Sequence, residues 1–185
     1  MRNKIGKVIR EKFTRELKNT LPQFDPLELS GSTGNLLFRW KIADNLNCFV
    51  FLQMSAKQYE DNFTVELACS AMDDYPFKQG ARGPDWINKD GSVRFRLPQL
   101  YVEEWRPQTA FVPWWWVGPR RTARELSPII EANSMEGKIT DVCEGMLPID
   151  EALLLVEPQV QDAVDRVKQF GIPFFLKFAE KQKPT

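Results

Sequence analysis

The sequence predicts an α+β fold: an antiparallel β-sheet of about four to five strands, flanked by an N-terminal amphipathic helix and C-terminal helices. Apolar side chains recur at three- and four-residue steps over residues 3–21, which is the period of a helix with one buried face. Runs between residues 36 and 97 alternate apolar and polar side chains, and most are joined by short links, as in antiparallel strands. After residue 121 the pattern becomes mainly helical, and no linker divides the chain, so we expect a single domain over residues 1–185.

The first expected element is a basic helix over residues 3–21. Its apolar stripe consists of Ile5, Val8, Ile9, Phe13, Leu17 and Leu21, and most of its lysines and arginines lie on the opposite side. Pro22 ends the helix, because the residue before a proline is pushed out of helical geometry. The turn-forming residues from Asp25 to Gly34 then predict a loop.

Four runs predict strands, at residues 36–42, 48–54, 62–71 and 92–97. The second run is apolar on both faces over its first five residues, which is typical of a central strand covered on both sides. The glycines and prolines of residues 73–91 predict a long loop. Residues 110–117 are a further candidate strand, and Pro113 favours an edge position because it cannot donate to a strand ladder.

Short helices are expected at the end of the chain. One covers residues 150–156 with Asp150 as its cap, and a second covers residues 158–170 with Gly171 as its stop. Residues 176–181 add a last helical turn.

The chain contains no histidine, which excludes Ser–His and Cys–His nucleophiles and histidine metal sites. Three widely spaced cysteines without a CxxC motif predict free thiols, and Cys48 and Cys69 lie in apolar runs where we expect them reduced and buried. Asp73 and Asp74 are a weak magnesium candidate, since adjacent aspartates at a strand end are more often turn formers. The sequence therefore predicts no catalytic residue, no metal site and no cofactor.

Charge limits the classes of partner. The chain has 25 basic residues (Lys and Arg) and 25 acidic residues (Asp and Glu). Its net charge is therefore zero, and the chain as a whole is not attracted to nucleic acid or to an anionic membrane. No apolar run approaches the length of a membrane helix, and the charged start lacks the apolar core of a signal peptide, so we expect a cytoplasmic protein. Residues 1–21 hold seven basic and two acidic side chains, whereas residues 140–166 hold one basic and seven acidic. These segments either face each other in the fold or give the chain an acidic surface for a basic partner.

Several motifs together resemble one bacterial protein family. These are the basic first helix, the runs Leu37-Phe38-Arg39-Trp40, Phe51-Leu52-Gln53-Met54-Ser55 and Phe63-Thr64-Val65-Glu66-Leu67, the tryptophans 114–116, and the segment Phe170-Gly171-Ile172-Pro173-Phe174-Phe175. In this order they resemble the family known as domain of unknown function 4304. The resemblance implies an α+β fold and a bacterial origin, and it transfers no catalytic residue.

The run Trp114-Trp115-Trp116 is the first candidate binding site. Successive strand residues point to opposite faces, so at least one indole lies on the face away from the core. Either a helix covers that indole, or it is exposed as an anchor for a protein partner or a second copy.

The second candidate is a basic strand face made of Arg39, Lys41, Arg94 and Arg96. If their two strands are neighbours, the four cations form one patch for a phosphate or an acidic surface. The alternative is a solvated face that Glu66 partly neutralises.

These observations favour a non-enzymatic binding protein with a protein partner or a homodimer, and an immunity or antitoxin-type inhibitor is one version of that role. One alternative is an anion or nucleic-acid binding domain that uses the basic strand face, although zero net charge argues against nucleic acid as the partner. The other is a histidine-free, magnesium-dependent phosphoryl enzyme that uses the region of Asp73 and Asp74.

Overall fold

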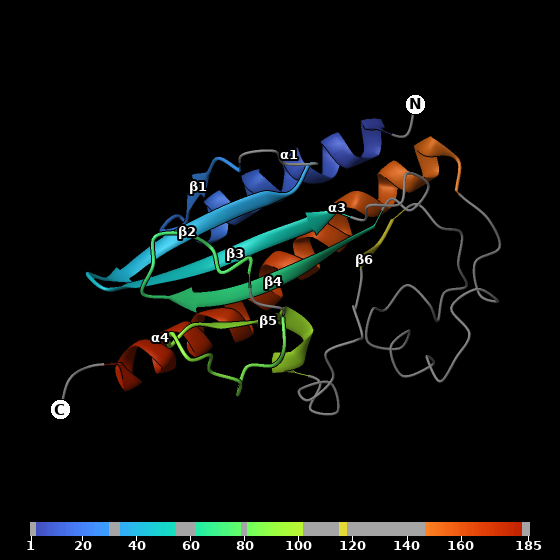
Figure 1. Ribbon diagram of the computed structural model, residues 1–185. Helices are drawn as coiled ribbons and strands as arrows, with labels where there is room; N and C mark the ends of the chain where they lie inside the picture. The colour runs from blue at the N-terminus through green and yellow to red at the C-terminus, as the bar shows by residue number, and fades with distance from the viewer. Residues whose placement is uncertain are drawn as a thin grey trace, which may run out of the picture.

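The fold is an antiparallel sheet with helices on one face (Figure 1). The structure is a computed structural model, and it describes residues 3–29, 34–54, 62–78, 81–101, 115–117 and 147–182. Its helices are α1 (Asn3–Thr20), α3 (Ile149–Arg166) and α4 (Ile172–Lys181), with a π-helical segment at Val167–Gly171 and a 3₁₀ turn at Leu97–Leu100. Its strands are β1 (Asp25–Leu27), β2 (Leu36–Ala43), β3 (Leu46–Met54), β4 (Asn62–Ser70), β5 (Val93–Arg96) and β6 (Trp115–Trp116). No described helix is long and apolar enough to cross a membrane.

The strands follow the order β1-β2-β3-β4-β5, and β6 pairs with β4 beside this path. Every pairing is antiparallel, so the predicted α+β class is confirmed. Strand β1 was expected to be loop. It pairs with β2 through three residues, and Pro26 at its centre removes one backbone donor from the strand at the edge of the sheet.

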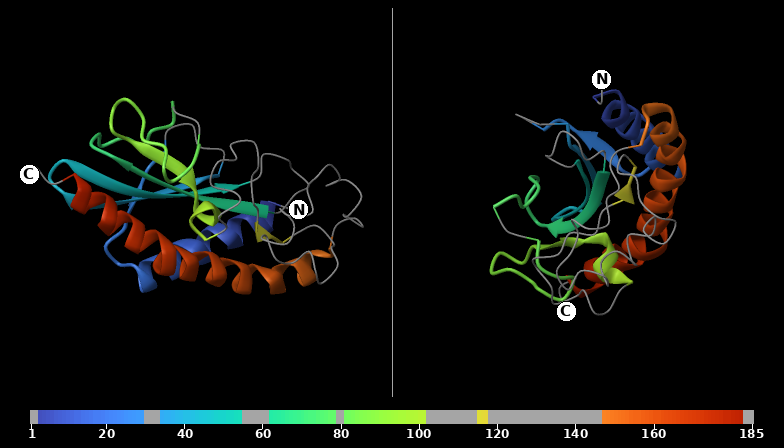
Figure 2. Two further views of the ribbon diagram at one scale, coloured as in Figure 1. Left: turned by 90° about the horizontal axis from the view of Figure 1, so that it is seen from below. Right: turned by 90° about the vertical axis from the view of Figure 1, so that its right-hand side faces the viewer.

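One face of the sheet packs against the helices (Figure 2). The apolar stripe of α1 is fully buried at Ile5, Ile9, Phe13 and Leu17. Alternate residues of β3 and β4, such as Val50 and Leu67, belong to the same core on the sheet side. The amphipathic pattern of the first helix therefore predicts its buried face correctly.

The C-terminal helices correct two sequence predictions. Pro158 was expected to separate two helices, but α3 continues through it. Both Pro158 and Leu154, whose carbonyl would receive the missing hydrogen bond, lie at exposed positions of the helix, so water can reach the unpaired carbonyl. The structure also places Asp150 inside the first turn of α3 and Pro148 at the cap position.

Gly171 was expected to stop a helix, but it is helical and the chain continues into α4. The reason for a glycine here is close packing, because a Cβ added at Gly171 would lie 3.0 Å from Cδ1 of Leu67. Gly171 therefore lets the helix approach the sheet.

The two described cysteines lie opposite each other on β3 and β4, on the helix-covered face. Cys48 and Cys69 are buried free thiols with their Sγ atoms 3.8 Å apart, as the sequence predicts. Burial raises the pKa of the Cys69 thiol, and the neighbouring Cys48 adds to the effect. Cys143 lies outside the described residues.

Opposite charges meet between the first helix and the acidic C-terminal segment. Lys12 of α1 forms an ion pair with Glu157 of α3, and its hydrogen bond lowers the pKa of that carboxyl. This contact agrees with the interpretation that the two segments face each other. Asp141 and Glu144 of the acidic segment lie outside the described residues.

Candidate functional site

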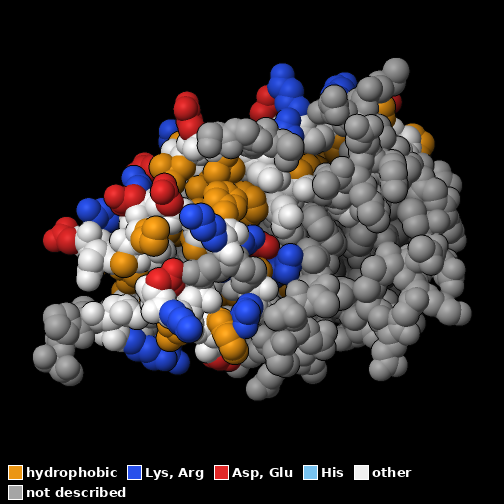
Figure 3. Space-filling model, viewed as in Figure 1, with side chains coloured by type: hydrophobic (Ala, Val, Ile, Leu, Met, Phe, Trp, Pro, Cys, Tyr) orange, Lys and Arg blue, Asp and Glu red, His pale blue; other side chains and the backbone are white. Residues whose placement is uncertain are grey.

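The candidate site is a pocket on the face of the sheet that the helices leave uncovered. It has a volume of about 800 Å³ and is formed by β1, β2, β3 and the segment 70–78 that follows β4. Its apolar lining comprises Leu27, Leu29, Leu37, Phe51, Met72, Tyr75, Pro76 and Phe77. Its polar lining comprises Glu28, Asn35, Arg39, Ser70, Asp73, Asp74, Lys78 and Asp90. Figure 3 shows hydrophobic side chains gathered on this face of the molecule, with charged side chains around them.

The floor of the pocket is a second, smaller apolar cluster on the sheet. Leu37, Phe49 and Phe51 are buried there together with Tyr75, which comes from the loop. The ring centroids of Phe51 and Tyr75 are 5.1 Å apart, and those of Tyr75 and Phe77 are 4.7 Å apart. The apolar character of both faces of residues 48–52 thus has a physical cause, because the loop covers the face opposite the helices.

Glu66 holds the loop in place. This carboxylate is 1% exposed, on β4, and accepts a hydrogen bond of 3.0 Å from the hydroxyl of Tyr75. Arg94 donates to the same carboxylate from Nε at 2.8 Å and donates from Nη1 to the backbone oxygen of Phe77 at 3.2 Å. The loop is therefore fastened to the sheet at the Tyr75 hydroxyl and at the backbone of Phe77.

The start of the loop is held in the same way. The side-chain amide of Asn47 donates to the backbone oxygen of Met72 at 3.1 Å, and the Met72 backbone amide donates to the Ser70 hydroxyl at 3.0 Å. As a result, Met72 and Phe77 project from a loop that is fastened near both of its ends. Their exposed fractions are 59% and 51%, although both line the pocket.

Burial and the charges around Glu66 together shift several pKa values. Burial raises the pKa of Tyr75 well above its usual range, and the Glu66 charge adds to this shift. Burial tends to lower the pKa of Arg94, but Tyr75 and Glu66 outweigh it and raise the pKa. Burial does lower the pKa of Arg96, whose contact with Glu66 is longer, 3.4 Å against 2.7 Å for Arg94.

The structure separates the four cations of the predicted basic face. Arg39 and Lys41 lie on β2, and Arg94 and Arg96 lie on β5, with β3 and β4 between them. Arg39 and Arg94 point to the same face in one cross-strand row, but three strand spacings put them about 14 Å apart. The four residues do not form one patch, because their strands are not neighbours.

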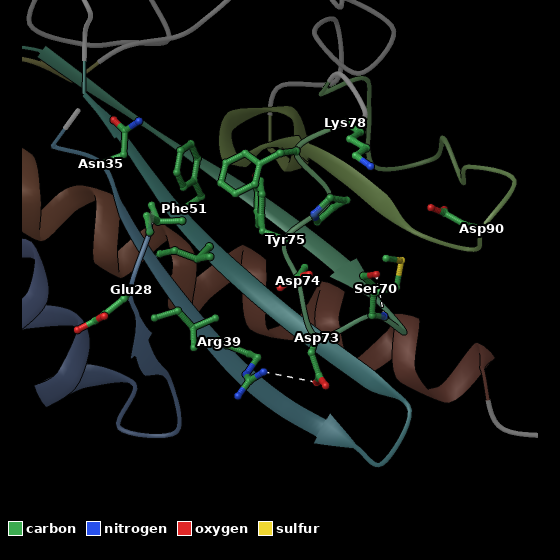
Figure 4. A pocket seen from close by; sticks show the side chains of 16 residues that line it. Glu28, Asn35, Arg39, Phe51, Ser70, Asp73, Asp74, Tyr75, Lys78 and Asp90 are labelled. Atoms are coloured by element: carbon green, nitrogen blue, oxygen red, sulfur yellow. Dashed lines mark hydrogen bonds and ion pairs between the residues drawn. The ribbon is translucent and has the colours of Figure 1, made fainter. Parts of the chain in front are cut away.

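The partners of these cations also differ from the predicted arrangement. Glu66 neutralises part of the charge on the β5 side, as the alternative interpretation expected, but this side is not solvated, because the side chains of Arg94 and Arg96 are largely buried. Arg39 pairs with Asp73 at 3.4 Å and lines the pocket (Figure 4), whereas Lys41 is exposed and does not line it.

The tryptophan run lies at the opposite end of β4, where β6 pairs with Asn62 and Phe63. Trp115 is fully buried, stacks on Phe63 with centroids 5.6 Å apart, and donates from Nε1 to Asp162 of α3 at 2.8 Å. The hypothesis that Trp115 is an exposed anchor is therefore wrong, because the helix layer covers its face of the sheet. Trp114 lies outside the described residues, and only the backbone of Trp116 is described.

The described residues do not form the magnesium site that was a candidate at Asp73 and Asp74. Asp73 pairs with Arg39 and accepts a hydrogen bond from Asn47, so part of its charge is already neutralised. In the described part of the chain, no three Cys, Asp or Glu side chains come together as ligands for a metal ion.

No family model, curated protein or solved structure matches the chain. The resemblance to domain of unknown function 4304 therefore stays a prediction.

Proposed function

We propose that this chain is a protein-binding module, and that the pocket on the open face of the sheet is its binding site. The observation that carries the proposal is the pair Met72 and Phe77, two large apolar side chains that line the pocket and are more than half exposed. Exposed apolar side chains gathered around a hollow are typical of surfaces that bind other proteins. Because the loop that carries them is fastened to the sheet, little conformational freedom is lost on binding.

Binding through side chains on the face of the sheet is favoured over addition of a strand to its edge. Strand β1 is the edge strand beside the pocket, and it has only three residues. Pro26 removes a donor at its centre, so β1 offers a poor ladder to an incoming strand. The partner's side chains would instead enter the pocket between β1 and the loop.

An immunity or antitoxin-type inhibitor is one version of this role. An excess of acidic side chains around the pocket supports it, since acidic inhibitors can occupy basic clefts.

The test is a selection of peptides from a random display library against the immobilised protein. We expect peptides that bind the wild type and lose binding to Phe77→Asp, since an apolar wall of the pocket would become charged. Ile87→Asp is the matched control, because Ile87 is 55% exposed but does not line the pocket. Peptides whose binding is equally sensitive to both changes, or no binding peptides at all, would contradict the proposal.

A further inference from the structure

The pocket combines an apolar floor with an acidic rim. Phe51 and Tyr75 form the floor with the side chain of Leu37, and the volume of about 800 Å³ leaves room for more than one side chain of a partner. Four carboxylates and two cations line the pocket, so its lining carries two negative charges in excess.

The excess charge belongs to carboxylates that remain free to attract a partner. Arg39 is paired with Asp73, which leaves Lys78 as the other cation of the lining. Glu28 and Asp74 are exposed, and neither forms an ion pair in the part of the chain that the structure describes.

These two carboxylates stand on different walls of the pocket. Glu28 directly follows β1 on one side, and Asp74 belongs to the loop on the other (Figure 4). A segment lying across the pocket would therefore pass between two negative charges while its central side chains reach the apolar floor.

From this arrangement we infer the chemistry of the partner: a segment of another protein that carries large apolar side chains flanked by lysine or arginine. The inference rests on the proposed function and adds the charge of the partner. Apolar side chains fill the hollow and provide most of the affinity, whereas the flanking cations pair with Glu28 and Asp74 and select the partner. Exposed ion pairs are weakened by salt, so the selectivity should fall as the ionic strength rises.

The experiment compares two pools of synthetic peptides with the same central apolar residues. One pool carries flanking lysines and the other flanking glutamates, and binding is measured by fluorescence anisotropy at low salt and at high salt. We expect the lysine pool to bind roughly tenfold more tightly at low salt, as two exposed ion pairs allow, and the difference to shrink at high salt.

Charge reversal at the pocket supplies the decisive variant. Glu28→Lys combined with Asp74→Lys should reverse the preference in favour of the glutamate pool. Asp44→Lys combined with Asp85→Lys is the matched control, because both residues are exposed and outside the pocket and the net charge changes by the same amount. The control should keep the preference for lysine.

The outcomes separate the two proposals. Equal binding of both pools that is lost in Phe77→Asp would overturn the inference but leave the binding site in place. Absence of any binding that depends on Phe77 would overturn both. Sedimentation velocity should show a monomer, and a dimer that Phe77→Asp dissociates would make a second copy the occupant and would also overturn the inference.

Discussion

The buried carboxylate of Glu66 provides the sharpest test of how the pocket is built. The perturbation is Glu66→Gln, which removes the negative charge and keeps the size of the side chain. Glu66 is 1% exposed, and the side chains of Arg94 and Arg96 beside it are each 13% exposed. Removing one partner of a buried ion pair leaves an uncompensated charge in a poorly solvated place, which costs about 3–5 kcal/mol.

We therefore expect the free energy of unfolding to fall by about 3 kcal/mol or more. Urea denaturation followed by tryptophan fluorescence measures this change. Arg39→Gln is the matched control, because it removes an arginine that pairs with an 82% exposed carboxylate, and it should cost less than about 1 kcal/mol.

A double-mutant cycle separates the interaction energy of the ion pair from the other effects of each substitution. Glu66→Gln and Arg94→Gln should be less costly together than the sum of the two single changes, by at least about 1 kcal/mol, because they share one interaction. A loss below about 1 kcal/mol in Glu66→Gln, or full additivity in the cycle, would refute the argument that this pair is buried and coupled.

Three further expectations concern the core and the loop. Gly171→Ala should lower the thermal midpoint by a few degrees, because the added Cβ would lie 3.0 Å from Leu67 and overpacking outweighs the gain in helix propensity. Trp115→Ala should cost about 3–5 kcal/mol in urea denaturation through lost stacking on Phe63, whereas an unchanged midpoint would contradict its burial. The raised pKa of Tyr75 keeps its hydroxyl protonated in the fold, so the free energy of unfolding should fall as the pH rises above about 10, the usual pKa of tyrosine. Urea denaturation at several pH values should show a smaller fall in Tyr75→Phe than in the wild type.

The sheet and the first helix could be predicted because their signals are local. Alternation along residues 36–42 separates the two faces of β2, and the structure keeps that separation: Phe38 packs with the helix-covered core, whereas Leu37 belongs to the cluster under the loop. The sequence predictions of helix ends at Pro158 and Gly171 were wrong because helix propensity describes an isolated chain. In the fold, the backbone carbonyl that Pro158 leaves unpaired lies at an exposed position, and the glycine serves the packing of helix on sheet.

The pocket could not be predicted in the same way. The loop lies over the sheet because Tyr75 reaches Glu66 and Phe77 accepts a hydrogen bond from Arg94, and these contacts join residues 9 and 17 positions apart, beyond the reach of strand or helix periodicity. One signal was present: Glu66 is the single charged residue of β4, whose other residues are apolar or uncharged. A charged side chain in a buried strand needs a partner of opposite charge, and the arginines of the basic strand face were the candidates for that partner.

The buried charges at Glu66 also allow stability to be separated from the geometry of the pocket. Buried ion pairs are often no more stabilising than apolar side chains of similar volume, so replacing Glu66, Arg94 and Arg96 together by methionine should leave the protein folded. The same triple change removes the acceptor for Tyr75 and the donor to the backbone of Phe77. We therefore expect a midpoint within a few degrees of the wild type, faster amide hydrogen exchange in residues 71–78, and loss of peptide binding. A triple variant that folds and still binds the selected peptides at wild-type affinity would show that the pocket does not depend on these charges.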